Sequence, residues 1–196
     1  MNQPHSDCKY CGREAVVQIS DVGTNSIISE IVCCRDHDIC GAIVFNNSSI
    51  SPEAVVSSSI DSRFTFRLKR LIAYNTGRYF ALMNCNETGF ELPLELALAE
   101  VTNLYWSLKH TDQVIQTPFR LYLDTLDVVN ARLEKMVVTR IRNEGKIITT
   151  ELHLRVPAGQ RILPLRASDA ICLATLANVP FDVARQAVID WPYPQH

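Results

Sequence analysis

Apolar and polar residues follow two different spacings along the chain, and these spacings predict its strands and helices. Alternation of the two kinds is typical of strands, and apolar residues every three or four positions are typical of helices. The predicted strands are residues 63–74, 78–84, 136–142, 146–156 and 161–165. The predicted helices are residues 96–109, 118–133 and 168–177. Because glycine-containing turns join the strands in pairs and helices follow them, the pattern predicts a mixed α+β domain.

One short pattern occurs twice in this domain. A Leu-Pro-Leu segment at 92–94 leads into the predicted helix that carries Glu100, and a second at 163–165 leads into the helix that carries Asp169. The two segments and the two acidic residues are offset by nearly the same number of positions. The repetition predicts a duplicated unit of strands followed by a helix, and the alternative is a chance match of two short segments.

The helix at 168–177 has recognisable ends. Ser168 is a residue type that favours the N-cap position, and Asp169 in the first turn is favourable beside the positive end of the helix. Asn178, followed by Pro180, predicts the C-terminal end. A well-capped helix explains these residues without any function.

The first forty residues hold five of the seven cysteines, beside a histidine. Cys8 and Cys11 form one pair with two residues between them, and Cys34 and His37 form a second pair with the same spacing. A predicted β-hairpin between the pairs brings them together, so these four residues predict a tetrahedral zinc site. Four protein ligands leave no open position for water, which favours a structural role for the metal.

Other readings of this cluster are a set of unpaired thiols, a redox pair, or a zinc site in which another residue replaces one ligand. The residues that remain candidates for such a replacement are His5, Cys33 and Cys40. The two later cysteines, Cys85 and Cys172, lie in apolar surroundings and are predicted to be buried core thiols.

The composition divides the chain into three zones. Residues 1–45 form the predicted zinc-ribbon-like module, residues 46–61 a linker rich in Ser and Asn, and residues 62–191 the main domain. No apolar run approaches the roughly 18 residues of a membrane helix, and the polar N-terminus lacks a signal-peptide core. We therefore expect a cytoplasmic protein without a membrane partner.

The formal net charge of the 196-residue chain is −2, so any binding of nucleic acid must use a local patch. Arg63, Arg67 and Lys69 alternate with apolar residues in the predicted strand 63–74. On a strand this spacing places the cations on one face, where they are candidates for contacts with a phosphate backbone. The alternative is an ordinary solvated face or a charged edge that discourages aggregation.

The segment 165–174, Leu-Arg-Ala-Ser-Asp-Ala-Ile-Cys-Leu-Ala, followed by Asn-Val-Pro-Phe-Asp-Val at 178–183, resembles the signature of the bifunctional nuclease family, a DNase/RNase domain. The Leu-Pro-Leu segment at 92–94 with Glu100, and the segment around Glu151, are similar to further elements of that family. The resemblance covers roughly residues 63–190. It implies two β3α2-type repeats forming a single barrel-like sheet, and a zinc-ribbon-like extension also occurs in relatives.

The chain departs from the family pattern at two informative places. Residues 120–122 read Arg-Leu-Tyr where the family has Thr-His-Asp, and Ala167 stands where the family has proline. The first departure removes a histidine and a carboxylate from the expected chemistry.

The resemblance implies a metal-dependent nuclease acting on DNA, RNA or both. Glu100, Glu151 and Asp169 are the candidate ligands for Mg²⁺ or Mn²⁺, and Arg166 is the candidate partner of the phosphate. Each of the four also has an ordinary explanation as a helix cap or ion-pair partner. The alternative function is a non-catalytic regulatory module that binds nucleic acid or protein. We also expect a homo-oligomer, most simply a dimer, and a protein partner for the zinc module.

Overall fold

The computed structural model describes residues 9, 16–24, 26–33, 63–85, 87–110, 117–142 and 147–189. The described strands are β1 (Val17–Val22), β2 (Ile27–Cys33), β3 (Arg63–Tyr74), β4 (Tyr79–Cys85), β5 (Glu91–Leu96), β6 (Arg132–Arg142), β7 (Ile147–Val156), β8 (Gly159–Arg166) and β9 (Phe181–Ala184). The described helices are α3 (Leu98–Lys109), α4 (Pro118–Val128), α5 (Ala167–Ala177) and α6 (Arg185–Ile189). The predicted α+β class is confirmed.

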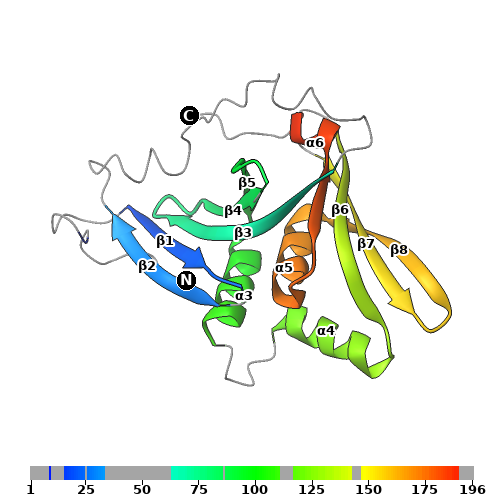
Figure 1. Ribbon diagram of the computed structural model, residues 1–196. Helices are drawn as coiled ribbons and strands as arrows, with labels where there is room; N and C mark the ends of the chain where they lie inside the picture. Colours follow the sequence, from blue (N-terminus) through cyan, green and yellow to red (C-terminus); the bar gives the residue numbers. More distant parts are fainter. Residues whose placement is uncertain are drawn as a thin grey trace.

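All nine described strands belong to one sheet, with the order β2-β1-β3-β9-β6-β7-β8 and with β4 and β5 branching from β3. Two successive units are visible in the element order (Figure 1). The first runs β3-β4-β5-α3 and the second β6-β7-β8-α5, and the strands of each are antiparallel neighbours. The predicted repetition of strands followed by a helix therefore corresponds to the observed order.

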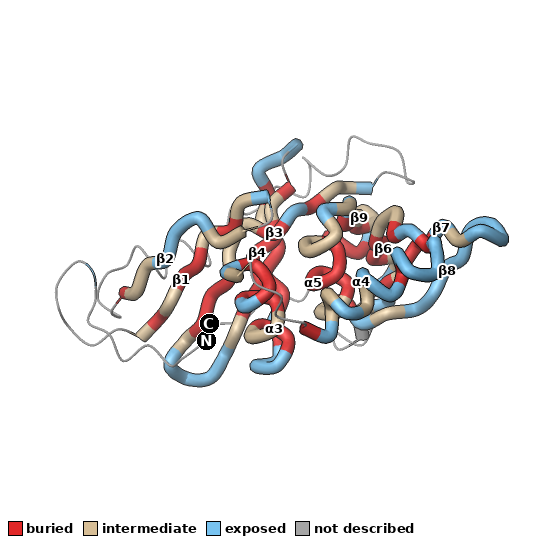
Figure 2. Tube along the Cα trace, turned by 90° about the horizontal axis from the view of Figure 1, so that it is seen from below, coloured by how far each residue is buried: buried red, intermediate tan, exposed pale blue. Residues whose placement is uncertain are grey.

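The main core lies between the sheet and the helices α3 and α5, which pack against each other. Figure 2 shows buried residues along β3, β4 and α5, whereas β8 is exposed along most of its length. Cys85 and Cys172 lie in this core and are free and buried, as predicted. A smaller buried cluster includes Ile19, Ile72 and Phe80.

The sheet is open, so the predicted barrel-like closure is wrong for the described strands. β2 and β8 end the path, and β5 ends the branch, each with one strand neighbour. The reason lies in how the two units meet. The short strand β9 pairs antiparallel with β3 and parallel with β6, and no other described strand joins the units.

The predicted helix 118–133 is too long at its C-terminal end. α4 ends at Val128, and Asn130 has a φ of 54°, in the left-handed region. The N–H of Ala131 then donates to the carbonyl of Leu126 at 2.8 Å, which is a common way to close a helix. The chain enters β6 at Arg132, four residues earlier than the apolar pattern indicates. The predicted end of the last long helix is confirmed, since Asn178 has a φ of 51°.

The hairpin predicted between the two zinc-ligand pairs is present as β1 and β2. β1 also pairs antiparallel with β3, so the hairpin extends the main sheet. Polar contacts reinforce this junction: Arg70 Nε donates to Asp21 Oδ1 at 2.6 Å, and Glu30 accepts from Tyr105 Oη and Lys109 Nζ of α3, each at 2.7 Å.

No helix in the described part of the chain is long and apolar enough to cross a membrane.

We expect the substitution Glu30→Gln to destabilise the protein in a pH-dependent way. Although partial burial opposes ionisation, the hydrogen bonds from Lys109 and Tyr105 hold the pKa of Glu30 below its ordinary value. A lowered carboxyl pKa contributes stability above the pKa of the unfolded chain, and this contribution is lost as the pH falls through the folded value. The free energy of unfolding should therefore drop by about 1 kcal/mol at pH 7 and by clearly less near pH 3.

Urea unfolding of both proteins at the two pH values measures this difference. Glu87→Gln is the matched control, because Glu87 is exposed in the turn between β4 and β5 and should show no comparable pH-dependent loss. A Glu30→Gln loss that is equal at both pH values would contradict the assigned role of the charge.

Candidate functional site

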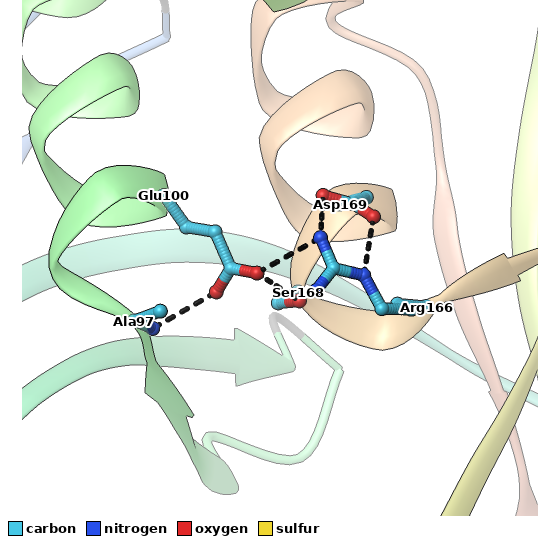
Figure 3. Close-up of polar contacts among 5 residues, drawn as sticks. All are labelled: Ala97, Glu100, Arg166, Ser168 and Asp169. Carbon is cyan, nitrogen blue, oxygen red and sulfur yellow. Dashed lines mark hydrogen bonds and ion pairs between the residues drawn. The ribbon is translucent and has the colours of Figure 1, made fainter.

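The N-termini of α3 and α5 lie next to each other and carry the charged residues predicted from the repeated pattern (Figure 3). Each helix starts where a strand with a Leu-Pro-Leu segment ends, β5 before α3 and β8 before α5. Glu100 and Asp169 each occupy the third position of their helix, so they are equivalent in the two units. A carboxylate in the first turn is favourable near the positive helix end.

Glu100 is the buried member of this cluster, with its side chain 10% exposed. One carboxylate oxygen, Oε2, accepts from the backbone N–H of Ala97 at 2.9 Å. The other, Oε1, accepts from Ser168 Oγ at 3.0 Å and lies 3.2 Å from Arg166 Nη2. The predicted N-cap role of Ser168 is wrong, because Arg166 occupies that position and Ser168 lies inside the first turn. Its hydroxyl orients Glu100 instead.

Arg166 connects the two carboxylates. Its Nε and Nη2 atoms donate to Asp169 Oδ2 and Oδ1 at 2.8 and 3.0 Å, and Nη2 also faces Glu100. The hydrogen bonds with Asp169 and the negative charge of Glu100 raise the pKa of Arg166 above its usual value. The Arg166 side chain is 72% exposed, whereas the two carboxylates beneath it are largely buried. The cluster therefore consists of an exposed arginine that is paired with two largely buried carboxylates.

Cys172 lies one turn further along α5, behind the cluster. Burial raises the pKa of its thiol, and the nearby charges of Glu100 and Asp169 raise it further. Since the thiolate is the reactive form, this cysteine is unsuited to act as a nucleophile. The polar groups that the cluster offers to solvent or to a ligand are therefore the carboxylates, Ser168 and Arg166.

Glu151 does not join this cluster. It lies on β7, and its Oε2 atom is 3.2 Å from His153 Nε2. Alternate residues of a strand share a face, so the spacing of two residues already indicates this pair, which the sequence prediction missed. Within the described part of the chain, no group of three or more His, Cys, Asp or Glu side chains is arranged to hold a metal ion.

The cationic row of β3 is largely paired within the protein. Arg67 Nη1 donates to Asn178 Oδ1 at 2.8 Å, and Lys69 Nζ lies 2.6 Å from Glu91 Oε1. A β-bulge places Lys69 outside the regular alternation, between two residues that pair with β4. Arg63 is exposed at the start of the strand. The alternation predicted for this face therefore extends from Arg63 to Arg67 and is interrupted at Lys69.

The four predicted zinc ligands, Cys8, Cys11, Cys34 and His37, lie outside the described residues. One described contact bears on them. The backbone N–H of Lys9, between the first two cysteines in sequence, donates to the carbonyl of Val32 near the end of β2 at 3.0 Å. Residue 9 therefore lies beside the strand that leads to the second predicted pair.

Comparison of the chain with models of known protein families and with curated proteins gives no match.

Proposed function

We propose that the protein is a metal-dependent nuclease that cleaves phosphodiester bonds of DNA, RNA or both, with its site at the N-termini of α3 and α5. The observation that carries this proposal is the convergence of Glu100, from α3, with Arg166 and Asp169, at the start of α5. Arg166 forms an ion pair with Glu100 and two hydrogen bonds with Asp169. The family resemblance implies these same residue types for this reaction. Two β3α2-type repeats form the proposed framework of the site.

The donor set fits a Mg²⁺ or Mn²⁺ ion. Mg²⁺ usually binds through one or two carboxylates, completed by waters and substrate phosphate, so a cluster of three acidic residues is not required. Glu100 Oε1 and Asp169 Oδ1 both contact the same nitrogen of Arg166, which means that a cation already occupies the space between them. A bound ion would supply Lewis-acid activation of the phosphate and of an attacking water.

Other groups of the protein would orient the carboxylates and bind the phosphate. The Ala97 N–H and the Ser168 hydroxyl hold Glu100 in a fixed orientation through both of its oxygens. The exposed guanidinium of Arg166 can pair with phosphate oxygens in a bidentate manner once an ion takes over its carboxylate partners. Arg63, Arg67 and Lys69 on β3 remain the proposed contacts for the rest of the nucleic acid.

The test is incubation of the pure full-length protein with single-stranded DNA and RNA, in Mg²⁺ or Mn²⁺ and in EDTA. Cleavage with metal and none above background in EDTA is the expected result. Absence of cleavage with either metal would overturn the nuclease proposal and favour the second function below.

That second function is a non-catalytic module that binds nucleic acid or protein. One observation favours it: Arg120, at the place where the family has Thr-His-Asp, donates through Nη2 to the carbonyl of Ser107 at 2.6 Å and ties α4 to α3. This position thus has a structural contact in place of acid–base chemistry. A binding module would retard labelled nucleic acid in a gel without cleaving it.

We also propose that Cys8, Cys11, Cys34 and His37 hold one structural zinc ion. The contact between Lys9 and Val32 supports this proposal, because it brings the neighbourhoods of the two ligand pairs together. Metal analysis of purified protein should give one zinc per chain, and the Cys8→Ser/Cys11→Ser variant should lose it. Retention of a full equivalent by that variant would refute the ligand set.

The remaining expectations concern assembly and location. We propose a homodimer in the cytoplasm, and a protein partner for the zinc module. The exposed edge strand β8 supports self-association, since Ile162 and Leu163 are 53% and 44% exposed there. An open strand edge with apolar side chains is a surface that proteins commonly cover.

A further inference from the structure

A pocket of about 280 Å³ opens where β3 changes neighbours in the sheet. Along one edge, β3 pairs with β9 up to Phe66 and with β1 from Arg70 onward. Residues 67–69 lie between these two ladders and pair with neither strand. The β-bulge at Lys69 lies in the same stretch. The pocket is therefore a consequence of the fork between β1 and β9.

The floor of the pocket is apolar and belongs to the main core. Phe66, Leu68, Met83 and Phe181 line it, and each is buried. The C-terminal turn of α5 closes one side, with the half-buried Thr175. Ligand sites are typically concave and apolar with a few polar groups at defined places, and this pocket has that composition.

The charged groups of the rim have one sign. Arg67 and Lys69 are the charged side chains among the described lining residues. Glu91 lies outside the lining and forms an ion pair with Lys69, so it offsets that charge. Arg67 contacts Asn178, a neutral residue that also lines the pocket. The net positive charge at the mouth is thus carried by Arg67.

We propose that this pocket binds a small amphipathic anion, with a carboxylate or phosphate on Arg67 and a compact apolar body on the floor. The volume of about 280 Å³ is close to the lower end of typical ligand pockets, which suits a compact apolar body of about ten heavy atoms. The pocket lies at the C-terminal end of α5 and the Glu100–Asp169 cluster at its N-terminal end, separated by a helix of about 16 Å. The pocket is therefore separate from the proposed cleavage site, although its Arg67 and Lys69 are also proposed contacts for the nucleic acid.

Three probes of nearly equal shape test this proposal on the full-length protein: 3-phenylpropionate, 3-phenyl-1-propanol and 3-phenylpropylammonium. Calorimetric titration should show one saturable site for the carboxylate, with an affinity at least about tenfold higher than that of the alcohol. The ammonium should bind more weakly than the alcohol. Phenyl phosphate, titrated in the same way, distinguishes a phosphate ligand from a carboxylate. Equal affinities for the three charge states, or no binding of either anion up to about 10 mM, would overturn the proposal.

Two variants place the binding in this pocket. Arg67→Gln should reduce the preference for the carboxylate over the alcohol to less than about threefold, whereas Arg63→Gln, an exposed cation of the same strand outside the pocket, should keep it. Thr175→Trp should fill the space and abolish binding of both compounds. Circular dichroism verifies that each variant is folded. If Thr175→Trp is unstable, the comparison of Arg67→Gln with Arg63→Gln still tests whether the ligand binds in this pocket. An equal loss in both arginine variants would contradict the assignment.

Discussion

Replacing Phe181 by alanine is expected to lower the free energy of unfolding by about 3–5 kcal/mol, since large-to-small changes in a core lose both transfer energy and packing. Phe181 lies in β9, the described strand that joins the two units of the sheet. It is the register partner of Phe66 in β3 and of Met136 in β6, and all three are at most 1% exposed. The cavity left by the missing ring would therefore weaken the packing of β9 against both β3 and β6.

Urea unfolding followed by circular dichroism measures this loss. Ile28→Ala is the control, because Ile28 is 69% exposed and its truncation should change the free energy of unfolding by less than about 0.5 kcal/mol. Phe181→Leu should fall between the two, since it retains most of the apolar volume. A Phe181→Ala protein within about 1 kcal/mol of the wild type would show that β9 is not essential to the junction.

Strands such as β3 and β6 were predictable because their apolar side chains are buried in a common core. In β3 the alternation of Phe64, Phe66 and Leu68 with polar residues marks the strand directly in the sequence. The bulge after Leu68 was not predictable, since it depends on the pairing with β4 and β1 and not on residue type. The same holds for the contact of Glu30 with α3, which joins residues far apart in the chain.

The candidate site was partly predictable for a similar reason. A helix places its third residue at a known point of the first turn, so Glu100 and Asp169 were expected at equivalent places. Glu151 was grouped with them from the resemblance alone, and its strand face directs it to His153 instead. The hydrogen bond from Ser168 to Glu100 forms only because α3 packs beside α5, and this packing cannot be predicted from the helix propensities of the residues.

The substitutions Glu100→Gln and Asp169→Asn together are expected to reduce the proposed metal-dependent cleavage by at least about 100-fold, because neutral amides bind Mg²⁺ and Mn²⁺ far more weakly than carboxylates. Both changes conserve side-chain size, and Asn and Gln retain an acceptor oxygen for Arg166 or Ser168. Circular dichroism spectra and unfolding midpoints should therefore stay closer to the wild type than those of alanine variants. Initial rates on single-stranded DNA and RNA, measured over a range of metal concentrations, give the reduction.

Glu151→Gln is the matched control for this experiment, because it removes a carboxylate of the same protein that contacts His153 and not Arg166. It should retain cleavage within about threefold of the wild type if the site consists of Glu100 and Asp169. Cleavage that survives the double substitution would refute this site. A loss in Glu151→Gln as large as in the double variant would instead mean that the carboxylate on β7 reaches the substrate together with the helix cluster, as the family resemblance implies. The three-carboxylate site would then have to form upon binding, since in the described structure Glu151 is held on the face of β7 by its contact with His153.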